Sequence, residues 1–275
     1  MLEEINNKEM KIIEILSITM HLFMKNFKKI LIVVALIFFP ISILNVLIVE
    51  RLSTSIIVLL DLIATKGLLD NMSVLIEAYL DLMRNNMLLM AVSVFLEPVG
   101  IIAIAIIVKG YLYNETIHLR EAIGEAMNCL WKIIVAGLIS SILIILATIC
   151  FIIPGIYLGI IWTFYVYAIG LRGYKGWKAL AYSKKLIDGR FWKTLGFLIV
   201  ISFIAVLCNK VMGSVFYLLP KHIATDILYD VLTYFYVSFE CIALTVLFMN
   251  REVVLLGEKH NTTECTGESK VDEDV

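Results

Sequence analysis

The stretch IIVAGLISSILIILATICFIIPGIYLGIIWTFYVYAIGL, residues 133–171, decides the fold of this chain. Its 39 residues contain no Lys, Arg, Asp, Glu or His, and Pro154 and Gly155 stand just past its middle. As a single helix at about 1.5 Å per residue, it would be nearly twice as long as the roughly 30 Å hydrocarbon core of a bilayer. The stretch therefore predicts two membrane-spanning helices, with the chain turning around at the Pro-Gly pair.

Similar apolar blocks recur along the whole chain of 275 residues. Hydrophobic residues make up 61% of it, charged residues make up 17%, and the mean hydropathy is +0.93. This composition is typical of a polytopic membrane protein. The blocks are continuously apolar and do not alternate, which favours helices over barrel strands. We predict an all-α fold with six transmembrane helices, at residues 30–49, 87–108, 133–153, 155–171, 194–209 and 231–249.

The charge distribution divides the chain into three expected parts. Residues 1–29 form a cytoplasmic amphipathic segment, and residues 30–249 form the six-helix domain. Residues 250–275 are acidic and poor in apolar residues, which predicts a disordered cytoplasmic tail. Within the six-helix domain we expect a long exterior loop at about 50–86, containing a helix near the surface, and a basic cytoplasmic loop at about 172–193.

The entrance to the first, third and fifth blocks follows one pattern. In each case an amphipathic segment is followed by an aromatic-Lys pair, and the pairs are Phe27-Lys28, Trp131-Lys132 and Trp192-Lys193. An aromatic ring and a Lys at the interface fix where a helix enters lipid, so the pattern is explained by three similar anchors. The other interpretation is a repeated unit of an amphipathic helix and a hairpin. It gives three hairpins, each preceded by a cytoplasmic amphipathic helix.

The basic residues predict the orientation in the membrane. With the N-terminus inside, 18 of the 23 Lys and Arg residues fall on cytoplasmic segments and five fall outside. This bias is the one described by the positive-inside rule. We therefore expect a multi-pass protein of the cell membrane, of bacterial type, with both termini in the cytoplasm.

The loop over 172–193 contains seven basic residues and a single acidic one, Asp188. Such a loop attracts anionic head groups by about 1 kcal/mol per well-placed charge. One interpretation is a surface for anionic lipid or for a partner protein, and the other is that the charges only hold the loop inside. The candidate residues of this surface are Lys175, Lys178, Lys184, Lys185, Arg190 and Lys193.

Two carboxylates lie within the apolar blocks. Glu97 is near the centre of the second block, directly before Pro98, and Glu240 is near the centre of the sixth. A charged side chain at mid-bilayer costs roughly 2.5 to 3.5 kcal/mol on insertion scales, so both need a partner. Because Pro98 removes a backbone donor, a helix break beside Glu97 can create a polar transport site. The alternative is a protonated Glu that serves helix packing, bonded to a freed carbonyl or to Tyr234 or Tyr236.

Small residues mark a helix-packing face in the decisive stretch. Gly155 and Gly159 form a GxxxG step, and Gly137 and Ser141 offer a matching ridge on the preceding span. We expect these four residues to pack the two helices of the hairpin together. The sequence contains no P-loop, no dinucleotide fingerprint, no HExxH and no GxSxG. We accordingly expect no catalytic residue, no metal, no cofactor and no nucleic-acid partner.

A set of residues across the basic loop carries a family resemblance. The set is Pro154-Gly155-Ile156, Gly176-Trp177, Ala179-Leu180, Ser183, Leu186, Gly189 and Trp192. It resembles a bacterial six-span membrane domain that is sometimes fused to glycerophosphoryl diester phosphodiesterases, and it covers roughly residues 111–201. Members often have an Arg in the fourth span and a Glu shortly before the Ala-Leu pair. In this chain the fourth span has neither Arg nor Pro, and the residues that precede the Ala-Leu pair include Gly173, Tyr174 and Lys175. We expect no phosphodiesterase barrel, which needs about 250 residues, because the spans and their loops occupy the 275 residues.

These observations leave three functional hypotheses. The first is a non-enzymatic accessory or scaffolding protein that binds membrane lipids, in particular anionic ones, or membrane protein partners at the inner leaflet. The second is a transporter or permease component that uses Glu97 and Glu240. The third is a lipid-modifying enzyme, for which the sequence offers no nucleophile and no base.

Overall fold

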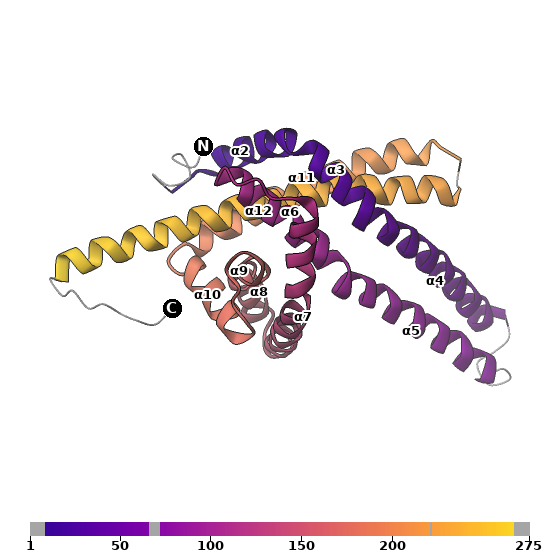
Figure 1. Ribbon diagram of the computed structural model, residues 1–275. Coiled ribbons are helices and arrows are strands. Elements are labelled where there is room, and N and C mark those ends of the chain that lie inside the picture. The colour runs from indigo at the N-terminus through magenta and orange to yellow at the C-terminus, as the bar shows by residue number, and fades with distance from the viewer. Residues whose placement is uncertain (1–8, 66–71, 221, 267–275) are drawn as a thin grey trace.

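The computed structural model describes residues 9–65, 72–220 and 222–266 (Figure 1). The described chain is all-helical, and none of these residues forms a strand. In chain order the helices are α2 (Ile12–Lys25), α3 (Phe27–Val33), the π-helical turn η1 (Val34–Phe38), α4 (Phe39–Thr65), α5 (Met72–Phe95), α6 (Glu97–Leu112), α7 (Leu119–Cys150), α8 (Ile152–Ile161), α9 (Tyr165–Arg172), α10 (Trp177–Ile187), α11 (Phe191–Tyr217) and α12 (Ile223–Thr266).

Six helical stretches of the described chain are long and apolar enough to cross a membrane, which confirms the predicted number. They are Phe27–Asp61, Ile76–Leu112, Leu119–Cys150, Ile152–Arg172, Phe191–Tyr217 and Ile223–Gly257. Large apolar side chains cover their outer surfaces, and Ile149 and Phe203, for example, are 76% and 68% exposed. Continuous apolar surface of this extent is stable in lipid and not in water. The six stretches indicate a multi-pass membrane protein.

Helix α12 is a long helix that packs against several of the others. It contacts α2, α4, α6, α10 and α11, and Figure 1 shows it running through most of the molecule. Helices α4 and α5 lie side by side and extend together away from the rest. Helix α6 lies at the centre of the core, because its apolar residues occur all round the helix and it is buried on all sides. Its fully or almost fully buried residues include Ile102, Ala103, Ile104, Ala105, Ile107 and Val108.

The segment 50–86 differs from the loop that the sequence predicts. Helix α4 continues through Thr65 and α5 begins at Met72, so most of this segment extends two spanning helices. Its Leu, Ile and Met residues occur at helical spacing between the charged ones. The segment therefore continues helices α4 and α5, which pack along one another. Residues 66–71 lie outside the described chain.

The hairpin turn in the decisive stretch lies three residues before Pro154. Helix α7 ends at Cys150, and Phe151 adopts an extended conformation (φ −156°, ψ 138°) that reverses the chain. Pro154 therefore lies in the first turn of α8, where its missing N–H leaves no hydrogen bond unmade. Gly155 allows a close approach, since a Cβ there would lie 2.0 Å from Thr148 Oγ1.

The fourth span is broken into α8 and α9 by a turn at residues 162–164. The broken backbone is bridged by Ser183 of α10. Its hydroxyl accepts a hydrogen bond from the Phe164 N–H (3.0 Å) and donates one to the Ile161 carbonyl (2.7 Å). Since buried backbone groups need partners, this side chain makes the interruption possible inside the core.

Helix α10 turns its apolar face to protein. Its buried residues are Ala179, Leu180, Ser183, Leu186 and Ile187, which recur at helical spacing. They pack against α7, α8, α9 and α12. The helix thus presents its Lys side chains, and not its apolar face, to the surroundings.

The predicted disordered tail is wrong over residues 250–266, which continue α12 as a helix. The charged residues at the start of this segment are part of the core, because Arg251 is 3% exposed and Glu252 is 5% exposed. Residues 267–275 lie outside the described chain.

Candidate functional site

A π-helical turn in the first span prepares the polar site inside the membrane. Pro40 lacks an N–H, and its ring would clash with the carbonyl four residues earlier in a regular helix. The π-turn Val34–Phe38 ends two residues before Pro40. The turn sets the ring of Phe38 against Gly100 and stacks it on Tyr234, with ring centroids 4.5 Å apart. The consequence is a tight junction of the first, second and sixth spans.

Glu97 lies at a helix break in this junction. Helix α5 ends at Phe95 and α6 begins at Glu97, with Pro98 in the first turn. The positive end of the α6 dipole favours a carboxylate at this position. The Glu97 carboxylate accepts hydrogen bonds from Tyr234 Oη (2.9 Å) and Ser93 Oγ (3.3 Å). A helix break beside Pro98 and a bond from Glu97 to Tyr234 were both expected from the sequence, the first for a transport site and the second for helix packing.

Tyr234 extends the polar contacts to the first span. Its hydroxyl accepts a hydrogen bond from Asn45 Nδ2 at 3.1 Å. The Asp230 carboxylate, one turn before Tyr234 on α12, faces the side chains of Ser42 and Asn45. We call Ser42, Asn45, Glu97, Asp230 and Tyr234 the intramembrane cluster.

Glu240 does not join the intramembrane cluster. It lies six positions after Tyr234 on α12 and makes no hydrogen bond or ion pair with the described residues. The two carboxylates paired by the transport hypothesis therefore have different surroundings.

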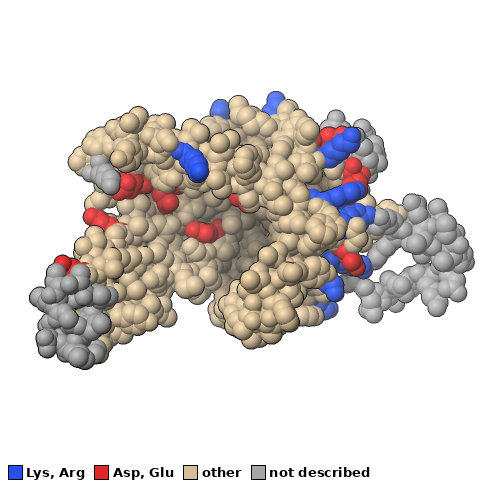
Figure 2. Space-filling view, turned by 180° about the vertical axis from the view of Figure 1, so that it is seen from behind, with Lys and Arg blue, Asp and Glu red and all other residues tan. Residues whose placement is uncertain are grey.

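Basic side chains gather at one end of the molecule. Figure 2 shows most of the visible Lys and Arg residues toward the end that holds the C-terminal part of α12, whereas acidic residues border the hollow in the middle of this face. We call this the basic end. Of the six predicted surface cations, four are exposed: Lys175, Lys178, Lys184 and Lys185.

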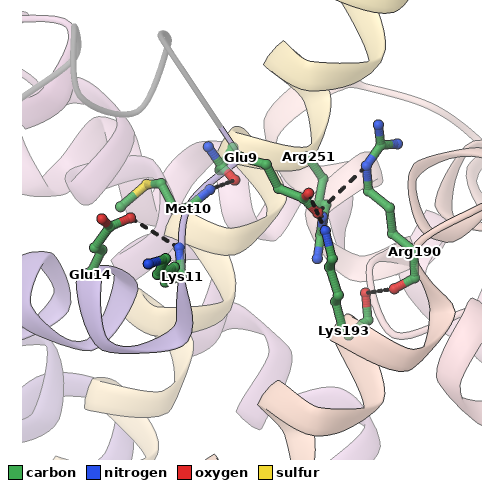
Figure 3. A network of polar contacts seen from close by, with 9 residues as sticks. Glu9, Met10, Lys11, Glu14, Arg190, Lys193 and Arg251 are labelled. Atoms are coloured by element: carbon green, nitrogen blue, oxygen red, sulfur yellow. Dashed lines mark hydrogen bonds and ion pairs between the residues drawn. The ribbon is translucent and has the colours of Figure 1, made fainter.

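The other two predicted cations contact Glu9, as Figure 3 shows. The Glu9 carboxylate pairs with Lys193 and with Arg251, and it lies 3.7 Å from Arg190 Nε. Partial burial alone would raise the pKa of the Glu9 carboxyl, but hydrogen bonds from Lys193 and Arg251 outweigh it and hold this pKa below its usual value. One carboxylate thus faces three cations, which leaves the site with positive charge.

Three consecutive residues of α12 connect it to other segments at the basic end. The Asn250 side chain accepts a hydrogen bond from the Met10 N–H (3.2 Å), and Arg251 pairs with Glu9. Glu252 accepts two hydrogen bonds from the Arg172 guanidinium, at 2.8 and 2.5 Å. Successive helical residues point about 100° apart, so each reaches a different neighbour.

Glu252 also accepts a hydrogen bond of 2.6 Å from the Tyr182 hydroxyl. Burial and then this bond raise the pKa of Tyr182. Since Arg172 ends α9 and Tyr182 lies on α10, the carboxylate joins three helices. No local pattern in the sequence indicates this contact.

A cavity of about 810 Å³ opens between α2, α11 and α12 beside Glu9. Its rim has the cations Lys11, Lys193 and Arg251. Arg251 is 3% exposed, and its Nε is buried without a hydrogen-bond partner among the described residues. The apolar walls include Ile12, Ile15, Leu16, Phe197, Val200 and Leu247. We call this cavity the basic groove.

The predicted helix-packing residues are used unevenly. Gly155 packs on α7, and Gly137 lies against Tyr165, since a Cβ there would be 3.1 Å from that hydroxyl. A Cβ on Gly159 would meet nothing within 4 Å, and Ser141 is exposed. The close contacts of this face therefore come from Gly137 and Gly155.

Comparison with protein families, with curated proteins and with solved structures finds no match. The resemblance to the six-span domain remains a prediction from its motif.

Proposed function

We propose that this chain is a non-enzymatic accessory protein of the cell membrane that binds anionic phospholipid in the basic groove. The proposal includes the predicted orientation, with the basic end and both termini in the cytoplasm. The observation that carries it is Arg251, a buried cation whose Nε is unpaired at the edge of an apolar groove.

The groove combines the two chemistries that a phospholipid needs. A phosphate ester accepts charge-assisted hydrogen bonds from Lys and Arg, which are about twice as strong as neutral ones. An acyl chain gains about 0.8 kcal/mol for each CH₂ group that is buried, and the groove walls are aliphatic and aromatic. A soluble phosphate would use the rim alone, whereas a phospholipid uses both parts.

Glu9 competes with the phosphate for the same cations. Its carboxylate pairs with Lys193 and Arg251 at the rim. An incoming phosphate that displaces it gains both partners and the free Nε of Arg251. The N-terminal segment can thereby report the occupancy of the groove to other proteins, which is the accessory role that we propose.

The test measures thermal unfolding of the purified chain in a neutral detergent, with added phosphatidylglycerol or phosphatidylcholine. Phosphatidylglycerol should raise the unfolding temperature more, and Lys193→Gln should reduce that difference. The matched control is Lys178→Gln, which removes an exposed Lys of α10 that does not line the groove. Equal responses to the two lipids, or equal losses in the two variants, would contradict the proposal. Identification of proteins that co-purify in mild detergent then tests the accessory role.

Transport is the second candidate function, and the hydrogen bonds of Glu97 within the membrane favour it. It requires that Glu97→Gln or Glu240→Gln abolish proton-dependent flux in vesicles. Flux that survives both substitutions would remove it.

A further inference from the structure

A second cavity, of about 900 Å³, lies between α4 and the first turns of α12. Asn45 and Asp230 of the intramembrane cluster line it, together with the exposed carboxylates Glu50 and Asp226. Asp230 and Arg251 are 21 positions apart on α12, which places this cavity roughly 30 Å from the basic groove. We call it the acidic pocket.

Three buried oxygen atoms of the cluster have no hydrogen-bond partner among the described residues. They are Ser42 Oγ, Asn45 Oδ1 and Asp230 Oδ2. Ser42 is 0% exposed, and its hydroxyl and the Asn45 side chain lie within hydrogen-bonding reach of the Asp230 carboxylate, which leaves the lone pairs of Ser42 Oγ and Asn45 Oδ1 as acceptors. A buried polar atom without a partner destabilises the fold, and a charged one does so more strongly. Asp230 Oδ2 and the two neutral oxygen atoms beside it point to a bound positive charge.

The hydrogen bonds of Tyr234 fix the orientation of the Asn45 amide. A tyrosine hydroxyl has one hydrogen, which Tyr234 donates to Glu97 at 2.9 Å. Its contact of 3.1 Å with Asn45 must therefore be accepted from the Nδ2 group. The amide cannot rotate to satisfy its own oxygen without losing this bond, so Oδ1 stays an acceptor.

We propose that Ser42, Asn45 and Asp230 bind a sodium ion that enters through the acidic pocket. A hydroxyl, an amide carbonyl and a carboxylate are hard oxygen ligands, which alkali and alkaline-earth ions prefer. Their single negative charge matches a monovalent ion. Glu50 and Asp226 at the pocket raise the local concentration of cations.

Other metals fit these ligands less well. Within the described ranges, no group of three or more His, Cys, Asp and Glu residues could hold a metal ion. The sodium site does not need such a group, because two of its three ligands are neutral. It also stands independently of the phospholipid proposal, since the two sites share no residue.

The test compares thermal unfolding of the full chain in sodium chloride and in choline chloride at equal concentration. Sodium should raise the unfolding temperature in a saturable way. Asp230→Asn and Ser42→Ala should abolish this increase, whereas Asp226→Asn should retain it, because Asp226 lines the same pocket but has no unpaired buried oxygen. If Asp230→Asn does not fold, Ser42→Ala decides.

Retention of radioactive sodium by the purified protein gives a second readout that does not depend on stability. Retention should be lost in Ser42→Ala and kept in Asp226→Asn. Equal unfolding temperatures in the two salts, or a sodium response that persists without the Asp230 carboxylate, would overturn the proposal. A failed lipid test would leave these results unchanged.

Discussion

Replacing Gly100 by Ala should destabilise the junction of the first, second and sixth spans. The added Cβ would lie 2.3 Å from Phe38 Cζ and 2.8 Å from both Cε atoms, whereas carbon atoms in contact prefer about 3.5 to 4.0 Å. The Phe38 ring is fully buried and stacked on Tyr234, so it cannot withdraw without breaking that stack.

The magnitude follows from two opposing effects. Overpacking a dense core costs typically about 1–3 kcal/mol, and Ala in a helix gains up to about 1 kcal/mol over Gly. Because the clash is severe, we expect a net loss of about 2 kcal/mol in the free energy of unfolding.

The assay is thermal unfolding in detergent, side by side with Gly159→Ala. A Cβ at Gly159 meets nothing within 4 Å, so this control isolates the helix-propensity gain and should be neutral or slightly stabilising. If the Gly100 variant proves as stable as the Gly159 variant, the close packing argued for Phe38 does not exist.

Three further changes should have distinct effects. Glu252→Ala leaves Arg172 without its carboxylate and should cost about 2–3 kcal/mol of unfolding free energy. This is less than for a fully buried pair, because the Arg172 side chain is 36% exposed. Denaturation curves measure the loss, and an unchanged midpoint would refute it. Ser183→Ala should cost about 1–3 kcal/mol in the same assay, whereas Ser141→Ala on the exposed face of α7 should be neutral. The pKa of Glu9 is lowered in the folded protein, so its stabilisation is complete above its ordinary value of 4.5 and disappears as the pH falls through the lowered value. Unfolding temperatures across acidic pH should therefore fall more steeply in the wild type than in Glu9→Gln.

The spans were predictable because lipid imposes one simple rule on the sequence. A helix that crosses the membrane needs about 20 apolar residues, and six such blocks are visible in the chain. The partner of Glu97 was also predictable in part, because a buried carboxylate needs a donor and Tyr234 was among the candidates named. Pro98 predicted the helix break that places Glu97 at the start of α6.

The remaining partners depend on contacts between distant parts of the chain. Glu9 meets Lys193 and Arg251 across separations of 184 and 242 positions, for which the sequence has no local signal. A run of charges after residue 249 indicates a solvated tail when it is considered alone. Only the opposite charges of Glu9 and Arg172, which are distant in the sequence, make it part of the core. The turn at Phe151 was misplaced because Pro is also well tolerated in the first turn of a helix.

The positions of Asn250, Arg251 and Glu252 also determine when the contacts of the basic end can form during synthesis. The apolar helices can enter the bilayer one after another as they leave the ribosome, but Glu9 and Met10 find their partners on α12 only after the sixth span has been made. Until then Glu9 lacks its contact with Arg251, and Arg172 lacks its contact with Glu252. Quality-control proteases would thus meet Glu9 and Arg172 side chains without these contacts on any product that stops before residue 250.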